Sequence, residues 1–471
     1  MAVDATTSAR MRDDALHLFR HSDVRPVHFV GIAGAGMSAL AELFVRRGIN
    51  VTGSDTSAAG NPDLEALGIT VHRGHSADFV TGARALVVSS AIAAEHVERA
   101  AAVALGLPVI RRAEALGAAV DGMQIVGIAG THGKTTTTVM ATEALAGTSA
   151  APTGIVGGRV QRWGGNLRWG GGDTVVVEAD EYDRSFLALH PTVAVVTNVE
   201  ADHLDIYADL ADITATFEQY LSKATGIVLC ADDRGAAALA LPDSADVIRY
   251  GLDGADARLV GIRDGGSMQV LFDGAPLGRI TLQVPGDHNK RNALAALGAG
   301  LLLGHPFEQL RTGLEAFGGV ERRFERKGEA NGIVVVDDYA HHPTEVRATL
   351  EAARAAYPER RIVALFQPHL YTRTRDFAGE FGVALAAGAD VFALTDIYKA
   401  REQPIPGVTA ELIAAAAARA GHPPDWFGLR ADATEGLKAL VRPGDLVLTM
   451  GAGDVTLVGP ELLAALHAVA S

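Results

Sequence analysis

A glycine-rich turn followed by lysine and threonine is the clearest chemical signature in this sequence. The apolar run 125–129 leads into Gly130-Thr-His-Gly-Lys-Thr-Thr136, and a helix-like pattern continues beyond it. Glycines let backbone N–H groups approach phosphates closely, and the start of a helix adds partial positive charge. In such loops the lysine reaches the outer phosphates and the next hydroxyl binds Mg²⁺. The spacing is a shortened P-loop, because Ile128 stands where the first glycine of the full motif belongs.

Acidic residues and a histidine follow the next two predicted strands. Segment 174–177 ends in Glu178-Ala-Asp-Glu181, and segment 192–196 runs on to Asp202-His203. Ligands of open α/β sheets bind beyond the carboxyl ends of the strands, and carboxylates suit Mg²⁺. We therefore expect Glu178 to bind a metal ion, and His203 to bind a metal ion or substrate.

A second glycine turn lies near the N-terminus. Residues 27–30 form an apolar segment that leads into Gly31-Ile-Ala-Gly-Ala-Gly36, and a helix-like segment and another strand then reach Asp55. This order predicts a βαβ nucleotide-binding unit in which Asp55 could hold a ribose hydroxyl. The glycine spacing does not meet the dinucleotide-binding fingerprint. A further strand, 85–91, contains serines, among them Ser90, that could face a phosphate.

Polar clusters also end the predicted strands of the C-terminal third, after a plausible hinge at Gly318-Gly319. Segment 333–336 precedes Asp337-Asp-Tyr-Ala-His-His342, and segment 362–366 precedes a run that ends at Arg373. The alternation of strands and helices predicts another doubly wound sheet. Several polar clusters on one sheet edge favour a binding site there.

Composition predicts a large acidic α/β enzyme. A chain of 471 residues exceeds one ordinary core, so several domains are expected. Its 41 basic and 56 acidic residues give a net charge of −15, which argues against nucleic acid as the main partner. Cys230 is the only cysteine, so no intrachain disulfide forms. The polar N-terminus has no signal-peptide pattern and no stretch approaches the ~20 apolar residues of a membrane span, so we expect a cytoplasmic protein without membrane insertion.

Taken in order, these motifs resemble those of the Mur ligase family. The matching stretches are 28–37, 130–136, 178–181, 198–203, 288–292, 322–324, 337–345 and 366–369. The pattern is most similar to the branch of the family that joins L-alanine to UDP-N-acetylmuramate. The resemblance implies ATP-dependent formation of an amide bond through an acyl phosphate, with Mg²⁺, in peptidoglycan precursor synthesis.

The resemblance also implies an α/β fold with three domains. A polar tail, 1–23, would precede a Rossmann-like UDP-binding domain, 24–121. A central P-loop ATPase-like domain with a parallel sheet, 122–318, would follow. A C-terminal Rossmann-like sheet, 319–471, would close over ATP and the amino acid. We expect a monomer or a weak homodimer.

Site residues follow from the same resemblance. The expected ATP-binding residues are Gly130, Thr131, His132, Gly133, Lys134, Thr135, Thr136, Asn289, Asn292, Arg323 and Asp338. Those expected to bind the sugar nucleotide or the amino acid are Gly34, Ala35, Gly36, Asp55, Ser90, His203, Tyr339, His341 and Arg373. The expected metal ligands are Thr135, Glu178 and His203. The expected catalytic residues are Lys134, Glu178, His203, His341 and Arg373.

One departure and three alternatives stay open. Leu370 occupies a position that is commonly basic in the family, so Arg373 or Arg375 would have to supply that contact. A recycling ligase that adds a preformed tripeptide to the same sugar nucleotide shares most of these motifs. A P-loop kinase would leave the first glycine turn and the paired histidines without a use, and the glycine order disfavours a nicotinamide-dependent oxidoreductase.

Overall fold

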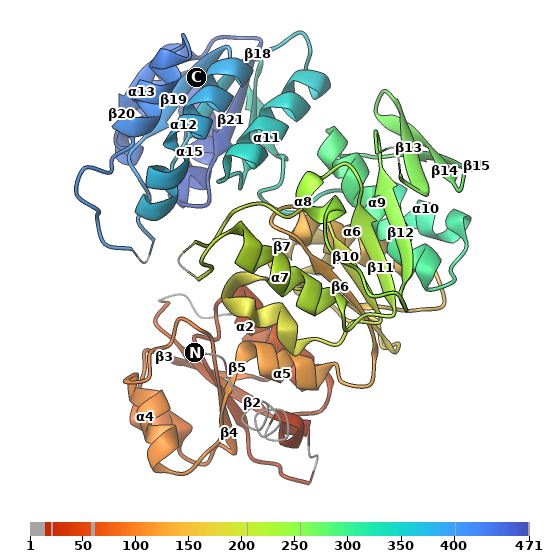
Figure 1. Ribbon diagram of the computed structural model, residues 1–471. Coiled ribbons are helices and arrows are strands. Elements are labelled where there is room, and N and C mark those ends of the chain that lie inside the picture. The colour runs from red at the N-terminus through yellow and green to blue at the C-terminus, as the bar shows by residue number, and fades with distance from the viewer. Residues whose placement is uncertain are drawn as a thin grey trace. The chain divides into compact units, whose positions relative to one another are not determined.

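The structure, a computed structural model, describes residues 15–19, 22–57, 62–204, 206–254, 256–400 and 402–469. The chain forms two compact units. The first runs to residue 281 and includes 291–317, and the second combines 282–290 with the chain from residue 318. Three sheets with flanking helices build these units, which confirms the predicted α/β class (Figure 1). The three expected domain boundaries remain a prediction, and most of the expected polar tail lies outside the described residues.

Five parallel strands form the first sheet, in the order β3-β2-β1-β4-β5. They are β1 (Val27–Val30), β2 (Val51–Asp55), β3 (Thr70–Arg73), β4 (Ala85–Val88) and β5 (Val109–Arg111). The associated helices are η1 (His17–Phe19), α2 (Ala35–Arg46), α3 (Pro62–Ala66), η2 (Ala77–Val80), α4 (Val97–Ala104) and α5 (Arg112–Ala119). The chain builds one side of β1 first and then the other. The strand order therefore reverses between β1 and β4, where such sheets bind ligands.

Ten strands form the second sheet, in the order β15-β14-β13-β12-β11-β10-β6-β9-β7-β8. They are β6 (Gln124–Ala129), β7 (Thr153–Val160), β8 (Gly165–Arg168), β9 (Thr174–Glu178), β10 (Val193–Val196), β11 (Gly226–Cys230), β12 (Asp246–Gly251), β13 (Leu259–Asp264), β14 (Ser267–Phe272) and β15 (Ala275–Thr281). The helices are α6 (Lys134–Ala146), η3 (Gln161–Trp163), η4 (Tyr182–Ala188), α7 (Leu210–Leu221), α8 (Arg234–Ala237), α9 (Asp287–Leu302) and α10 (Phe307–Glu315).

The second sheet differs from expectation at both edges. The sequence predicts a small antiparallel excursion over 246–284, but β12 and β13 extend the parallel sheet and only β13, β14 and β15 pair antiparallel. Helix α8 lies in the connection from β11 to β12, and a parallel pair requires a crossover of this kind. At the other edge β7 and β8 form an antiparallel hairpin that the sequence did not predict. Its many glycines obscure the strand pattern.

The third sheet has the order β16-β17-β21-β18-β19-β20, parallel except for the β16–β17 pair. The strands are β16 (Glu325–Ala330), β17 (Ile333–Asp338), β18 (Arg361–Phe366), β19 (Val391–Thr395), β20 (Trp426–Gly428) and β21 (Asp445–Met450). The helices are α11 (Pro343–Ala356), α12 (Tyr371–Gly388), α13 (Glu411–Arg419), η5 (Arg430–Asp432), α14 (Ala433–Leu440), η6 (Asp454–Leu457) and α15 (Val458–Val469).

Two apolar cores lie on the two faces of this third sheet. Successive side chains of a strand point to opposite faces, so Val334 and Val336 enter one core while Ile333 and Val335 enter the other. Helices α11, α12 and α13 supply the first core, and α14 and α15 supply the second. Strands buried on both faces explain why the sequence shows continuous apolar runs instead of alternation.

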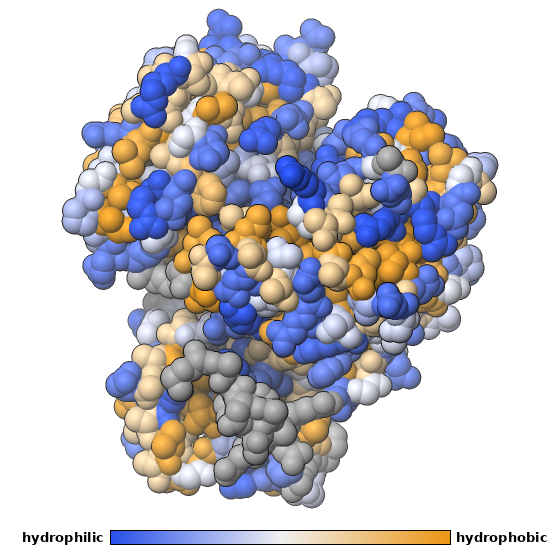
Figure 2. Space-filling view, viewed as in Figure 1, coloured by the Kyte–Doolittle hydropathy of each residue, from blue (hydrophilic) through white to orange (hydrophobic). Residues whose placement is uncertain are grey.

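Hydrophilic residues cover most of the visible surface, and hydrophobic residues appear there as separate patches (Figure 2). No helix among the described residues combines the length and apolar character that a membrane crossing requires. The apolar residues instead build the sheets, and the central strands β1, β10 and β21 are buried along their whole length.

Candidate functional site

The phosphate-loop sequence forms the turn between β6 and α6, as predicted. Gly133 caps α6 with a left-handed φ of 80°, and the helix begins at Lys134. Gly130 has a φ of 137°, and a Cβ atom there would lie only 2.0 Å from the Thr197 hydroxyl oxygen. Both positions therefore require glycine, and the first N–H groups of α6 follow directly after the turn.

Two residues at the end of β10 hold this loop, although the sequence analysis gave neither a role. The His132 amide donates to Oδ1 of Asn198 at 2.7 Å, and the Asn198 amide nitrogen donates back to the His132 carbonyl at 3.1 Å. The Thr197 hydroxyl donates to the same carbonyl at 2.6 Å. These bonds preorganise the loop. Their signal in the sequence was only an Asn at a strand end.

Lys134 forms a buried ion pair with Glu181. Its Nζ atom lies 2.8 Å from Oε2 of Glu181 and also donates to the Gly130 carbonyl at 2.7 Å. Only 4% of the Glu181 side chain is exposed. Burial alone would lower the pKa of Lys134, but the carboxylates of Glu181 and Asp180 outweigh it and raise that pKa. The sequence analysis missed Glu181, because nothing in the sequence separates it from the other acids of its segment.

Glu178 and Thr135 lie side by side at the same sheet edge. Glu178 ends β9, which pairs with β6 in a register that sets Glu178 opposite Ile128. The Thr135 hydroxyl and the Gly157 amide lie near the Glu178 carboxylate. Its buried Oε1 atom has no hydrogen-bond partner among the described residues. Burial raises the pKa of Glu178. Adjacent hard oxygen donors with an unsatisfied buried oxygen fit a divalent cation such as Mg²⁺.

His203 belongs to the Lys134–Glu181 group rather than to the Glu178 group. Its Nε2 atom lies 3.6 Å from Oε1 of Glu181 and 3.8 Å from Oδ2 of Asp202. Its φ of 54° is unusual for a residue other than glycine and is typical of strain held at functional sites. Burial lowers the pKa of His203, but its two carboxylate neighbours outweigh burial and raise it. Its role as a metal ligand remains a prediction.

The first sheet brings the expected sugar-nucleotide residues to one edge. Gly34 caps α2, and Ala35 and Gly36 begin the helix. Asp55 ends the neighbouring strand β2, and its carboxylate accepts the Ala33 amide at 3.0 Å, which holds the turn. Ser90 follows β4 and is exposed. The carboxyl ends of β2, β1 and β4 thus carry all five residues, as the βαβ prediction requires.

The buried carboxylate of Glu98 stabilises this edge of the first sheet. Glu98 is fully buried and accepts the Ser54 hydroxyl at 2.7 Å and the Ser76 amide at 3.1 Å. Its Oε2 atom lies 3.6 Å from Nε2 of the fully buried His28. Burial alone would raise the pKa of Glu98, but the nearby His28 and the hydrogen bonds from Ser54 and Ser76 lower it to about 2. Ser54 precedes Asp55, so Glu98 fixes the end of β2.

We expect Glu98→Gln to destabilise the protein by on the order of 3 kcal/mol at pH 7, because ~1.4 kcal/mol corresponds to each pKa unit. The folded pKa lies below the usual 4.5, so this contribution is present above about pH 4.5 and is lost as the pH falls towards about 2. Urea unfolding of the wild type and of Glu98→Gln should show a smaller difference in the free energy of unfolding at pH 3.5 than at pH 7. Exposed Glu95, changed to Gln, is the matched control. An equal difference at both pH values would contradict the assignment.

In the second unit, polar residues gather after β17. Asp338 accepts the amides of Phe324 and Ala340, each at 2.8 Å, and burial raises its pKa to about 6. The Tyr339 ring has the Arg323 guanidinium 5.1 Å from its centre. Nδ1 of His341 lies 3.1 Å from Oε2 of Glu345.

Arg373 lies in the first turn of α12, which follows β18 in the same unit. Its Nη1 atom lies 3.5 Å from Nδ1 of His369, and the His369 ring centre is 6.0 Å from that of His341. Leu370, at the commonly basic position, caps α12 with a φ of 71°, so the departure falls where the backbone is strained. Glu402 accepts the Thr372 amide at 3.1 Å and anchors the first turn of α12.

The two expected asparagines divide between the units. Asn289 lies in the second unit, where its side-chain amide donates to the Pro285 carbonyl at 2.7 Å. Asn292 lies in the first, with Oδ1 2.8 Å from where a Cβ on Gly133 would stand. Asn292 therefore packs against the phosphate loop, and its role in binding ATP remains a prediction.

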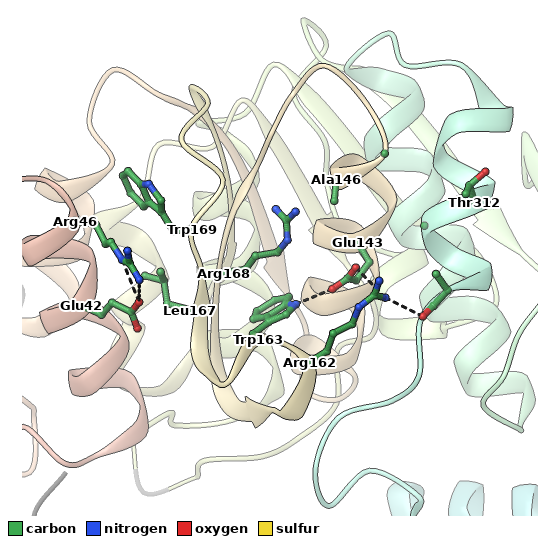
Figure 3. A pocket seen from close by; sticks show the side chains of 13 residues that line it. Glu42, Arg46, Glu143, Ala146, Arg162, Trp163, Leu167, Arg168, Trp169 and Thr312 are labelled. Atoms are coloured by element: carbon green, nitrogen blue, oxygen red, sulfur yellow. Dashed lines mark hydrogen bonds and ion pairs between the residues drawn. The ribbon is translucent and has the colours of Figure 1, made fainter. Parts of the chain in front are cut away.

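A hollow of about 640 Å³ elsewhere in the first unit shares no residue with the expected site. Figure 3 shows Trp163 and Arg162 converging on Glu143, which accepts the Trp163 indole N–H at 2.7 Å. Glu42 and Ala146 line it as well. These residues lie towards the C-terminal ends of α2 and α6, whereas both glycine turns lie at the N-terminal ends. The hollow is therefore distinct from the phosphate loop.

Family models match three consecutive segments of the chain. Residues 26–123 match "Mur ligase family, catalytic domain", residues 128–300 match "Mur ligase middle domain", and residues 322–453 match "Mur ligase, glutamate ligase domain". Together these segments contain the phosphate loop, the glycine turn after β1 and the polar clusters of the second unit.

Relatives are similar over nearly the whole chain. The UDP-N-acetylmuramate–L-alanine ligase of Salinibacter ruber is 47% identical over 443 residues, which cover 92% of this chain and 93% of the relative. The ligase of the same name from Geobacter sp. is 44% identical and covers 95% of this chain and 99% of its own. Among solved structures, UDP-N-acetylmuramate-alanine ligase from Thermotoga maritima has a TM-score of 0.80 at 27% identity, covering 94% of this chain and 100% of that one.

A murein peptide ligase from Psychrobacter arcticus has a TM-score of 0.69 at 24% identity, over 94% of this chain and 98% of that one. This second likeness shows a shared fold alone. The match in fold extends through all three sheets, whereas the high identity is to the relatives that use L-alanine.

Proposed function

The chain belongs to the Mur ligase family, and on that premise we propose that it joins L-alanine to the carboxylate of UDP-N-acetylmuramate at the expense of ATP. The observation that carries the proposal is the near-full-length match to relatives named for this reaction. The geometry supports it, because a preorganised phosphate loop and a nucleotide-type glycine turn occur in the same unit.

The first chemical step joins two anions. A carboxylate oxygen of the muramoyl group attacks the γ-phosphorus of ATP, the bond to the ADP oxygen breaks, and an acyl phosphate forms. Lys134 would lower the repulsion between the reactants, since its ammonium group is held at the loop by Glu181. The remaining loop residues, from Gly130 to Thr136, would bind the phosphates through backbone N–H groups.

Thr135 and Glu178 would hold Mg²⁺, which supplies positive charge next to the transferring phosphate when it is bound. His203 would be a third ligand or would steady the substrate. Asn289, Asn292, Arg323 and Asp338 would help to bind ATP. Gly34, Ala35, Gly36, Asp55 and Ser90 would line the UDP end of the site.

The second step forms the amide bond. The amino nitrogen of L-alanine attacks the acyl carbon, a tetrahedral intermediate forms, and inorganic phosphate leaves with the electrons of the broken C–O bond. The nitrogen loses its proton to the surroundings. Tyr339, His341 and Arg373 would face the muramoyl group or the alanine, and Arg373 would pair with the alanine carboxylate.

The product is a peptidoglycan precursor, and we expect the reaction to take place in the cytoplasm, where ATP is made. We expect the enzyme to be a monomer or a weak homodimer, which size-exclusion chromatography at two concentrations would test. The alternative is a recycling ligase that uses a tripeptide in place of L-alanine. The high identity to relatives named for L-alanine disfavours it.

The acceptor experiment tests this function directly. With ATP, Mg²⁺ and UDP-N-acetylmuramate held constant, phosphate release should be fastest with L-alanine. Glycine should be about 10- to 200-fold less efficient, because one methylene is worth only that much discrimination. Large side chains should not fit, and D-alanine should misdirect its amine. Faster turnover of L-alanyl-γ-D-glutamyl-diaminopimelate would make the recycling ligase the better assignment, and release without any amine would favour a kinase.

A further inference from the structure

Arg112, the first residue of α5, packs directly on the glycine turn of the first sheet. A Cβ atom built on Gly36 would lie 3.0 Å from Nη1 and 3.4 Å from Cζ of Arg112. The guanidinium therefore lies next to the first turn of α2. Arg112 directly follows β5, and the first sheet places the end of β5 near this turn. Arg112 was not among the site residues expected from the sequence.

The other side of this guanidinium faces the acidic segment after β9. Its Nη2 atom lies 3.8 Å from Oδ2 of Asp180, and 28% of the Arg112 side chain is exposed. An ion pair at this distance and exposure contributes little to stability. It does orient the guanidinium, which is thereby directed between the glycine turn and the segment that carries Glu178.

The preceding arginine shows that this placement is specific. Arg111 is engaged locally: its Nε and Nη2 atoms donate to Oε1 of Glu114 at 2.8 and 2.6 Å, in the capping interaction of α5. Within the described part of the chain, no hydrogen bond of ordinary length engages the guanidinium of Arg112. The two adjacent arginines thus differ: Arg111 caps its own helix α5, whereas Arg112 lies against the glycine turn.

A guanidinium presented at this turn suits a phosphate group. Arginine offers a planar fork of donors that binds phosphate in a bidentate manner, and the first turn of a helix adds N–H groups and partial positive charge. The chain carries a net charge of −15, so an anionic ligand needs local cations of this kind.

We propose that Arg112 binds the pyrophosphate of the sugar nucleotide and thereby sets the position of the muramoyl group relative to the phosphate loop. This inference rests on the proposed function, because it takes UDP-N-acetylmuramate as the ligand of the glycine turn. Asp180 is a positioning residue for Arg112 in this arrangement. The muramoyl carboxylate then stays free to attack the γ-phosphorus of ATP.

The test measures binding to the full-length protein by titration calorimetry, with UDP-N-acetylmuramate, UDP, UMP and ATP as separate probes. Arg112→Met should weaken UDP binding by about 10- to 100-fold, the range expected for one charge-assisted phosphate contact. UMP binding should weaken less, because UMP lacks the second phosphate, and ATP binding should be unchanged. Arg112→Lys should fall between, since lysine keeps the charge but not the fork. Arg111→Met, the matched control, should bind UDP as the wild type does.

The outcomes separate the two proposals. If the wild type binds neither UDP nor UDP-N-acetylmuramate, the proposed function is wrong and the role of Arg112 falls with it. If the wild type binds UDP and Arg112→Met binds it equally well, only the role of Arg112 is wrong. A parallel loss of UDP and ATP binding would show a structural role and would also overturn the inference.

Discussion

Replacing Lys134 with alanine should slow phosphate release by roughly 10²- to 10³-fold, as expected when one preorganised group that stabilises transition-state charge is removed. The Nζ atom is held within 2.8 Å of Glu181 and 2.7 Å of the Gly130 carbonyl, so the ammonium is fixed at the phosphate loop before substrate arrives. The rate should be measured at saturating ATP, UDP-N-acetylmuramate and L-alanine. Near-normal phosphate release by the folded variant would contradict the role of Lys134.

The buried ion pair makes a stability control necessary. Lys134→Ala leaves the Glu181 carboxylate buried with His203 as its neighbour, and breaking a buried pair costs about 3–5 kcal/mol. A second variant should therefore combine Lys134→Ala with Glu181→Gln, which removes the uncompensated charge. This double variant should recover thermal stability without recovering turnover. Recovery of both would show that the single variant failed by unfolding.

Glu178→Gln should raise the Mg²⁺ concentration needed for half-maximal activity by more than the roughly 10- to 100-fold that outer-shell changes cause. The substitution keeps the side-chain volume and removes the charge that a cation needs. The KM for UDP-N-acetylmuramate should change much less. The measurement is a MgCl₂ titration at fixed substrates, with Asp173→Asn as control, because Asp173 is an exposed acid just before the opposite end of β9.

The metal-free stability of this variant gives an independent check. Burial raises the folded pKa of Glu178 above its usual value, so the charged form costs stability once the pH rises through that pKa. Glu178→Gln should therefore be at least as stable as the wild type at pH 8 in EDTA. An unchanged Mg²⁺ titration would show that Glu178 is not a metal ligand, and a large loss of stability in EDTA would show that its carboxylate is structural.

The sequence by itself determined the family, the α/β class and the location of the chemical groups along the chain. Both glycine turns form where the sequence predicted them, between β1 and α2 and between β6 and α6. Polar residues at strand ends were predictable for a physical reason: in a parallel sheet the carboxyl ends of the strands meet at one edge. Glu178, Asp55 and Asp338 could therefore be assigned to sheet edges from their place after apolar runs, without knowledge of any contact.

Other parts of the first unit depended on contacts between residues far apart in the sequence. The pairing of Lys134 with Glu181 joins residues separated by 47 positions, and the bond between Asn198 and the His132 amide spans 66. No periodicity reports such contacts. The glycine-rich hairpin of β7 and β8 was missed for a different reason, because glycine carries no side chain from which a strand pattern could be read.

Neighbouring residues of the same type show the limit most clearly. Arg111 and Arg112 are equivalent in the sequence, as are Glu178 and Glu181 in a short acidic run. Only the tertiary structure decided that Arg112 reaches the glycine turn while Arg111 binds Glu114, and that Glu181 pairs with Lys134 while Glu178 lies against Thr135. The physical reason is that adjacent side chains leave the backbone in different directions, so their partners are set by whichever strand or helix packs on each side.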